Sequence, residues 1–163
     1  MATAQVDSST TAAFVNPIIS ATLETFEMML GVVPKRTGLQ INESHTPTYD
    51  VSAMISMTGQ IKGTIVFSVA GEAALNIFEQ LIGDKSESLN EEVCDAIGEV
   101  SNMIAGSAKA KLAELELSLG LPTMVMGRDH RIHYPDSVAR PIQLLFESDL
   151  GPFTLEFGFA KED

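Results

Sequence analysis

The chain has 163 residues, of which 45% are hydrophobic and 20% charged, values typical of a single globular domain. Ten basic residues against 22 acidic ones give a formal net charge of −12, which repels phosphate backbones and anionic lipids. We therefore expect no binding to nucleic acid or to a membrane, and no apolar run approaches the ~20 residues of a membrane span. We expect a flexible N-terminal tail over residues 1–11 and a single domain over residues 12–163.

The first half of the chain predicts one helix followed by three strands. Apolar residues at helical spacing predict the helix over Ala12–Leu30. Asn16 is its expected cap because the following residue, Pro17, favours the first helical position. The strands are expected at positions where apolar and polar residues alternate, and the last two form a hairpin: Lys35–Asn42, Tyr49–Met57 and Gly63–Val69.

The longest predicted element is a helix from Ser88 to Gly120, which follows a short helix over Glu72–Ile82. Ser88 and Glu91 have the spacing of a capping box, and Gly120 before a proline marks the end. At about 100° per residue, one stripe of this helix is apolar and must face a core. The stripe consists of Val93, Ile97, Val100, Ile104, Ala108 and Leu115.

The opposite side of this long helix is polar and narrow. Asp95, Glu99, Asn102 and Gly106 fall within an arc of roughly 60°. Gly98 and Gly106 each cost roughly 1 kcal/mol relative to alanine inside a helix, and close approach of another backbone is the usual compensation. Two interpretations stay open on this pattern: the helix passes under a loop of its own chain, or this face receives another protein.

Further strands are predicted after the long helix, at Thr123–Met126, Arg131–His133, Ile142–Glu147 and Phe153–Ala160. The two halves of the chain then share the order helix, strand, hairpin, which indicates a weak internal duplication. We expect an α+β fold in which two long helices cover a shared, mainly antiparallel sheet.

The segments DAIGEVSNMIAG, beginning at Asp95, and PTMVMGRDHRI, beginning at Pro122, together resemble the CheC/CheX/FliY family of phosphatases, and its CheX members in particular. Asp95, Glu99 and Asn102 match the family pattern D/S-x-x-x-E-x-x-N. The resemblance extends across the chain through the N-terminal helix, a GxxxGxI hairpin at Gly59–Ile65 and a hydrophobic C-terminal strand. The link from Asn102 to Pro122 is a couple of residues shorter than in the family. The resemblance implies a CheC/CheX-like fold with pseudo-duplicated helix–strand–hairpin halves.

The family's activity would be hydrolysis of the aspartyl phosphate of a CheY-like response regulator. By this resemblance, Asn102 would orient the attacking water and Glu99 would dock on the regulator's active-site lysine. The chemistry suits these residue types, because an amide is a poor base but can hold a water in line, and a fixed carboxylate pairs with a cation. The residues implied to contact the regulator surround this pair: Asp95, Gly98, Met103 and Gly106.

The resemblance also implies a homodimer with no cofactor of its own, since Mg²⁺ would be supplied by the regulator. We expect a cytoplasmic protein, because a single cysteine suits a reducing compartment. Two non-catalytic alternatives stay open. One is a dimeric module that binds receiver domains or belongs to a flagellar switch, and the other is a structural dimer whose glycines serve subunit packing. Ala13 stands one turn before Asn16, where a glutamate would be required, so we predict one site per chain.

The remaining reactive side chains predict no second chemistry. Cys94 is the single cysteine, which excludes an internal disulfide and suits a reducing compartment, and we expect a buried thiol rather than a nucleophile. His130 and His133 fall on opposite faces of a strand predicted over Arg128–Pro135, and they therefore make a poor metal pair.

Overall fold

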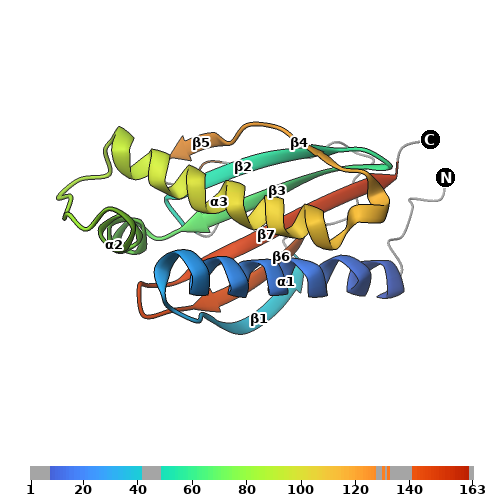
Figure 1. Ribbon diagram of the computed structural model, residues 1–163, viewed down its shortest axis with the longest axis horizontal. Helices are drawn as coiled ribbons and strands as arrows, with labels where there is room; N and C mark the ends of the chain where they lie inside the picture. The colour runs from blue at the N-terminus through green and yellow to red at the C-terminus, as the bar shows by residue number, and fades with distance from the viewer. Residues whose placement is uncertain (1–7, 42–48, 128–129, 131, 133–140, 162–163) are drawn as a thin grey trace.

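The computed structural model of the chain describes residues 8–41, 49–127, 130, 132 and 141–161. Within these ranges, three helices pack on one face of an antiparallel sheet of seven strands, which confirms the predicted α+β class (Figure 1). The helices are α1 (Ser8–Leu30), α2 (Gly71–Ile82) and α3 (Glu91–Lys111), and a 3-10 turn spans Ala113–Leu115. The strands are β1 (Lys35–Ile41), β2 (Val51–Thr58), β3 (Ile61–Val69), β4 (Ser118–Leu119), β5 (Thr123–Met126), β6 (Ile142–Glu147) and β7 (Phe153–Lys161).

The order of the strands shows the two halves of the chain interlocked. The order is β1-β6-β7-β3-β2, and both β4 and β5 pair with β2. At the centre, β3 and β7 pair from Ile61 opposite Lys161 to Val69 opposite Phe153. Outside this pair, the first strand of each half joins the second strand of the other half, β1 with β6 and β5 with β2. This exchange confirms the predicted pseudo-duplication, and α2 lies between the two halves in the sequence.

The first helix begins earlier than predicted. It includes residues 8–11, which were assigned to a tail, and Asn16 lies inside it rather than at its cap. Pro17 removes a backbone hydrogen bond from the helix interior. However, the turn before it carries the buried Phe14, whose ring stacks on that of Phe159 at a centroid distance of 4.4 Å. Burial of this side chain offsets the lost hydrogen bond.

The long helix also begins at a different residue from the predicted one. The side-chain oxygen of Asn90 accepts a hydrogen bond from the N–H of Val93 at 3.0 Å, which makes Asn90 the cap. Ser88, the predicted cap, lies outside the helix and is exposed, and Glu91 is the first helical residue rather than the partner in a capping box. Asparagine caps as well as serine does, so the S-x-x-E spacing was misleading.

We therefore expect Asn90→Ala to lower the free energy of unfolding by about 1 kcal/mol, because the N–H of Val93 loses its acceptor. Ser88→Ala is the matched control and is expected to change it by less than about 0.5 kcal/mol, as at other exposed sites. Urea unfolding of the two variants measures both. A larger loss of unfolding free energy in Ser88→Ala than in Asn90→Ala would instead support the predicted capping box.

A distant hairpin contacts the turn that follows the long helix. Helix α3 stops at Lys111, and the 3-10 turn after it is followed by Glu116 in the left-handed conformation, with φ of 50°. The N–H of Gln60, in the turn between β2 and β3, donates to the carbonyl of Leu115 at 3.1 Å. The chain then adds β4 to the edge of β2, so Gly120, the predicted helix end, follows a strand. The helix predicted up to Gly120 is therefore wrong over its last turns.

The other predicted elements agree with the structure to within about three residues at each end, as expected for boundaries. Gly31 and Gly83 follow α1 and α2 with positive φ, as helix-ending glycines do. The strand predicted at Arg131–His133 lies largely outside the described residues. Ile132 is described, is not in a strand, and packs on Val66 on the face of the sheet away from the helices.

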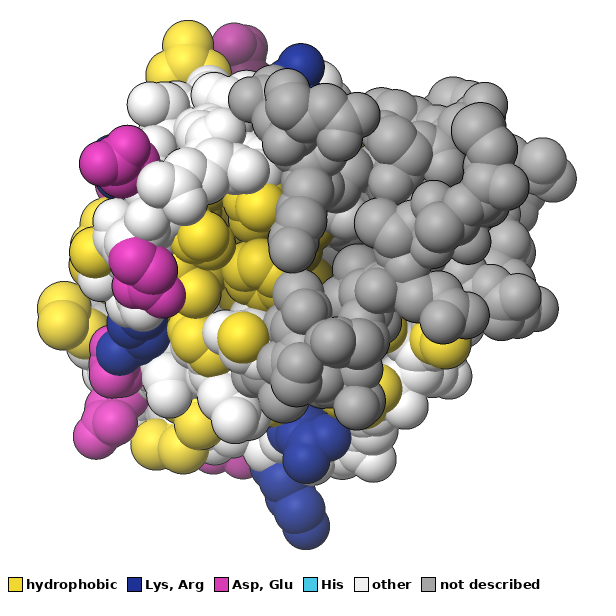
Figure 2. Space-filling view, turned by 90° about the vertical axis from the view of Figure 1, so that its right-hand side faces the viewer, with side chains coloured by type: hydrophobic (Ala, Val, Ile, Leu, Met, Phe, Trp, Pro, Cys, Tyr) yellow, Lys and Arg dark blue, Asp and Glu magenta, His cyan; other side chains and the backbone are white. Residues whose placement is uncertain are grey.

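The core lies between the helix layer and the sheet. The rings of Phe26 and Phe146 both stack on Phe153, with centroid distances of 4.4 and 4.9 Å. Figure 2 shows the end of the molecule at which α3 finishes, where apolar side chains gather between the charged residues of the helix side and residues that the structure does not describe. No helix in the described part of the chain has the length and apolarity needed to cross a membrane.

Candidate active site

Helix α3 presents two chemically distinct faces, as predicted. Its apolar stripe is fully buried against the core from Val93 to Ala108, except that Leu115 lies beyond the helix in the 3-10 turn. Asp95, Glu99 and Asn102 are exposed on the opposite side. Because four turns of the helix are fixed by packing behind them, the carboxylate of Glu99 and the amide of Asn102 stand one turn apart on a rigid element.

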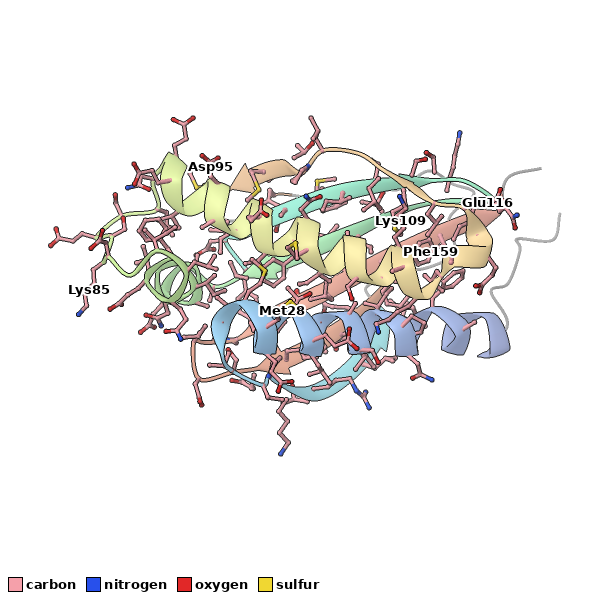
Figure 3. The ribbon with its side chains drawn as sticks, viewed as in Figure 1. Met28, Lys85, Asp95, Lys109, Glu116 and Phe159 are labelled. Carbon is pink, nitrogen blue, oxygen red and sulfur yellow. The ribbon has the colours of Figure 1, made fainter. Side chains whose placement is uncertain are left out.

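The polar row follows the length of the helix. Figure 3 shows Asp95 pointing away from the body of the protein near the N-terminal end of α3, on the outer surface of the helix layer. Lys109 lies toward the C-terminal end of the same helix, and Met28 lies between α3 and α1. Asp95 and Glu99 therefore give the first half of this surface a negative charge, and Met28 of α1 adds an exposed apolar side chain.

The two helical glycines differ in their surroundings. Gly98 is buried, and a Cβ placed on it would lie 3.4 Å from Met124 Sδ and 3.8 Å from the Cβ of Pro122. It therefore packs under the segment leading into β5. Its predicted contact with a partner stays a prediction. A Cβ on Gly106 would meet nothing within 4 Å, apart from its own helix. The close approach predicted at Gly98 is thus made by the chain's own segment, whereas Gly106 lies open.

A groove lies beside Asn102, between α1 and α3. Its volume is about 360 Å³. The residues that line it come from α1, α3 and β4: Glu24, Thr25, Met28, Met29, Asn102, Met103, Gly106, Ser107 and Leu119. The carboxylate of Glu24 spans the two helices, accepting from Lys111 at 2.9 Å and from Ser107 at 3.4 Å. We refer to this feature as the methionine groove.

The sequence missed the contribution of α1 to this site. Phe26 and Leu30 define the core face of α1, and Met28 stands about 200° away from Phe26 on the helix. A long apolar residue outside the predicted apolar face was the available signal. The position of the groove was not visible in the sequence, because the antiparallel packing of α1 on α3 depends on the sheet beneath both.

Cys94 is buried, as predicted. Its Sγ lies 3.0 Å from the Sδ of Met126, and burial, followed by the charges of Asp95 and Glu91, raises the pKa of the thiol. A raised pKa keeps the group protonated at neutral pH, whereas a nucleophilic cysteine needs the thiolate. Cys94 thus serves packing between α3 and β5.

His130 anchors its segment to the sheet. Its Nδ1–H donates to the carbonyl of Gly127 at 2.6 Å, and its Nε2 lies 2.9 Å from the hydroxyl of Ser52. Ser52 is fully buried and also contacts the hydroxyl of Ser68 at 3.1 Å, so this pair is structural. His133, the other half of the rejected metal pair, lies outside the described residues.

Asn16 is exposed on α1 and has Ala13 one turn before it. Its predicted role as a cap is wrong, because the helix begins more than one turn earlier. The absence of a carboxylate at position 13 is still the reason to expect one site per chain, and this stays a prediction.

The comparison with known families agrees with the fold. The family described as chemotaxis phosphatase CheX matches residues 51–146, a range that contains both Glu99 and Asn102. The chain belongs to this family, which confirms the resemblance noted in the sequence.

Individual relatives agree with this assignment. The CheY-P phosphatase CheX of Thermotoga maritima is 34% identical over 143 residues, which cover 85% of this chain and 92% of the relative. The crystal structure of the chemotaxis protein CheX from Vibrio vulnificus has a TM-score of 0.80 at 31% identity and covers 90% of this chain and 98% of that one. The CheX of the CheX–CheY–BeF3–Mg²⁺ complex from Borrelia burgdorferi shares the fold, with a TM-score of 0.72 at 18% identity over 92% of this chain and 98% of that one.

Proposed function

We propose that this protein accelerates hydrolysis of the aspartyl phosphate of a CheY-like response regulator. The observation that carries the proposal is the exposure of Glu99 and Asn102, one turn apart, on a helix whose opposite face is fixed in the core. A site that must enter the active site of another protein has to project from a rigid element in this way. The name of the Thermotoga maritima relative, CheY-P phosphatase CheX, supports the same activity here.

The chemistry assigned to this chain is the positioning of water. The side-chain amide of Asn102 holds a water molecule in line with the phosphorus–oxygen bond of the aspartyl phosphate. The water oxygen forms a new bond to phosphorus while the acyl oxygen leaves with its electron pair, which regenerates the aspartate carboxylate. The product is inorganic phosphate, and the proton released from the water passes to the phosphate or to solvent. Orientation of this kind is the role of the water-positioning glutamine in small GTPases.

Glu99 holds the regulator in place for this step. Its ionised carboxylate pairs with the lysine of the receiver active site, and Asp95, one turn earlier on the same face, extends the negative surface. The Mg²⁺ that accompanies the phosphoryl group would be held by the regulator. The homodimer implied by the family resemblance stays a prediction.

The decay rate of a phosphorylated cognate regulator tests the proposal directly. We expect the wild-type protein to accelerate loss of phosphate and the double variant Glu99→Ala/Asn102→Ala to leave only the intrinsic decay of the regulator. Circular dichroism confirms that the variant remains folded, as expected for two exposed substitutions.

A non-catalytic module that binds receiver domains is the alternative. This alternative predicts that the regulator binds the wild-type protein while its phosphate decays at the intrinsic rate. Unchanged decay with every cognate regulator encoded in the same genome would therefore overturn the proposed activity, whether or not a complex forms.

A further inference from the structure

The methionine groove opens directly beside the proposed catalytic amide. Asn102 forms part of its wall, and Thr25, Met28 and Met29 of α1 form the facing wall. Gly106 leaves a gap in the α3 side, since a Cβ there would meet no neighbour within 4 Å outside its helix. A group bound in this groove therefore lies next to Asn102.

Two exposed side chains beside the groove are apolar, whereas solvated helix surfaces usually carry charged or polar side chains. The side chain of Met28 is 78% exposed and that of Met103 is 40% exposed, while the buried Phe26 and Leu30 already supply the core contacts of α1 in this region. Removing exposed apolar surface from water is favourable, and methionine adapts its shape to different partners. These two residues thus offer binding energy that the isolated chain does not use.

The charged groups near the groove restrict what can occupy it. On α3, Asp95 and Glu99 lead toward Asn102 with two exposed carboxylates. On the other side, Glu24 is joined to Lys111, so that this cation is already paired. An occupant that fits both features carries a cation against the carboxylates and an apolar side chain against the methionines.

We propose that the methionine groove receives an apolar side chain of the receiver domain, next to its phosphorylated aspartate, and that Met28 sets the affinity for the regulator. This inference rests on the proposed function. If Asn102 meets the acyl phosphate of the receiver, the receiver also covers the neighbouring groove. The polar row aligns the phosphoryl group, and the groove supplies the apolar contact that holds the receiver during the step.

Kinetics of dephosphorylation separate the two roles. We expect Met28→Gln to raise the KM for the phosphorylated receiver about tenfold with kcat unchanged, because it replaces an apolar contact by a neutral polar one of similar length. Met28→Leu restores the apolar contact and is expected to restore KM. Ile82→Gln is the matched control, since Ile82 is 58% exposed at the end of α2 and outside the groove.

Binding gives a readout that does not depend on catalysis. The cognate receiver loaded with beryllofluoride and Mg²⁺ serves as the probe, and calorimetric titration measures its Kd for each variant. Met28→Gln is expected to raise Kd by the same factor as KM, whereas Asn102→Ala is expected to retain binding.

The possible outcomes distinguish this inference from the proposed function. If the wild-type protein is active and Met28→Gln leaves KM and Kd unchanged, the groove assignment is overturned and the phosphatase activity stands. If the wild-type protein is inactive but Met28→Gln weakens binding of the loaded receiver, the activity fails and the groove assignment stands. A change in sedimentation without a change in KM or Kd would identify a second copy of this chain as the occupant and would also overturn the assignment.

Discussion

Replacing Asn102 by alanine is expected to lower kcat for receiver dephosphorylation about 100-fold and to leave Kd for the receiver largely unchanged. The side chain is exposed on α3 and, in the proposed mechanism, orients the attacking water. Its removal therefore affects the transition state and not the docked complex. Rapid mixing of phosphorylated receiver with excess protein measures kcat, and titration with the beryllofluoride-loaded receiver measures Kd.

Asn16→Ala is the control for this experiment. Asn16 is also an exposed asparagine on a long helix, but Ala13 stands where the site requires a carboxylate. Its replacement is expected to leave kcat unchanged, as one site per chain requires. An equal fall in kcat for both variants would show that α1 carries a second working site. Loss of binding in Asn102→Ala would show that the amide contributes to docking rather than to the chemical step.

Replacing Gly63 by alanine is expected to lower the free energy of unfolding by about 2 kcal/mol, the usual range for overpacking. Gly63 lies in β3, opposite Phe159 on β7, and the ring of Phe159 covers it. A Cβ on Gly63 would overlap the Cδ1 and Cε1 atoms of this ring and would lie 2.8 Å from the carbonyl oxygen of Gly158. The ring cannot move away freely, because it also stacks on Phe14. Urea unfolding monitored by circular dichroism measures the loss.

The same substitution at Gly106 is expected to have the opposite sign. Its Cβ would meet open space, and alanine is favoured over glycine within a helix by about 1 kcal/mol. Gly106→Ala should therefore raise the free energy of unfolding. Equal effects of the two substitutions would show that strand β3 accommodates the methyl group by shifting, which would contradict the close contact with Phe159.

Local patterns in the sequence predicted the elements but not their ends. Apolar and polar residues alternate in β2 and β3, and apolar residues follow helical spacing in α3. These patterns involve residues close together in the chain, so they can be recognised in the sequence. The turn after α3 is held by Gln60, which contacts Leu115 from a distant hairpin. The continuation of α1 through Pro17 is accompanied by the burial of Phe14 against Phe159, at the other end of the sequence. Neither contact leaves a local signal.

The sequence likewise predicted part of the candidate site and missed the rest. The exposure of Glu99 and Asn102 follows from helical spacing opposite a strong apolar stripe, and the structure places both where they were expected. Gly98 lies on the edge of that face, and only the position of β5 shows that it is covered. Met28 joins the site from α1, and no spacing within α3 could indicate it.

The exchange of edge strands between the two halves determines when the sheet can form during synthesis of the chain. Gln40 in β1 and Gln143 in β6 are joined by a side-chain hydrogen bond although they are 103 residues apart. During synthesis, β1 therefore leaves the ribosome long before the strand that pairs with it, and its backbone N–H and C=O groups stay in water until then. Closing so long a loop is slow, so the domain completes its sheet only after β6 and β7 have emerged.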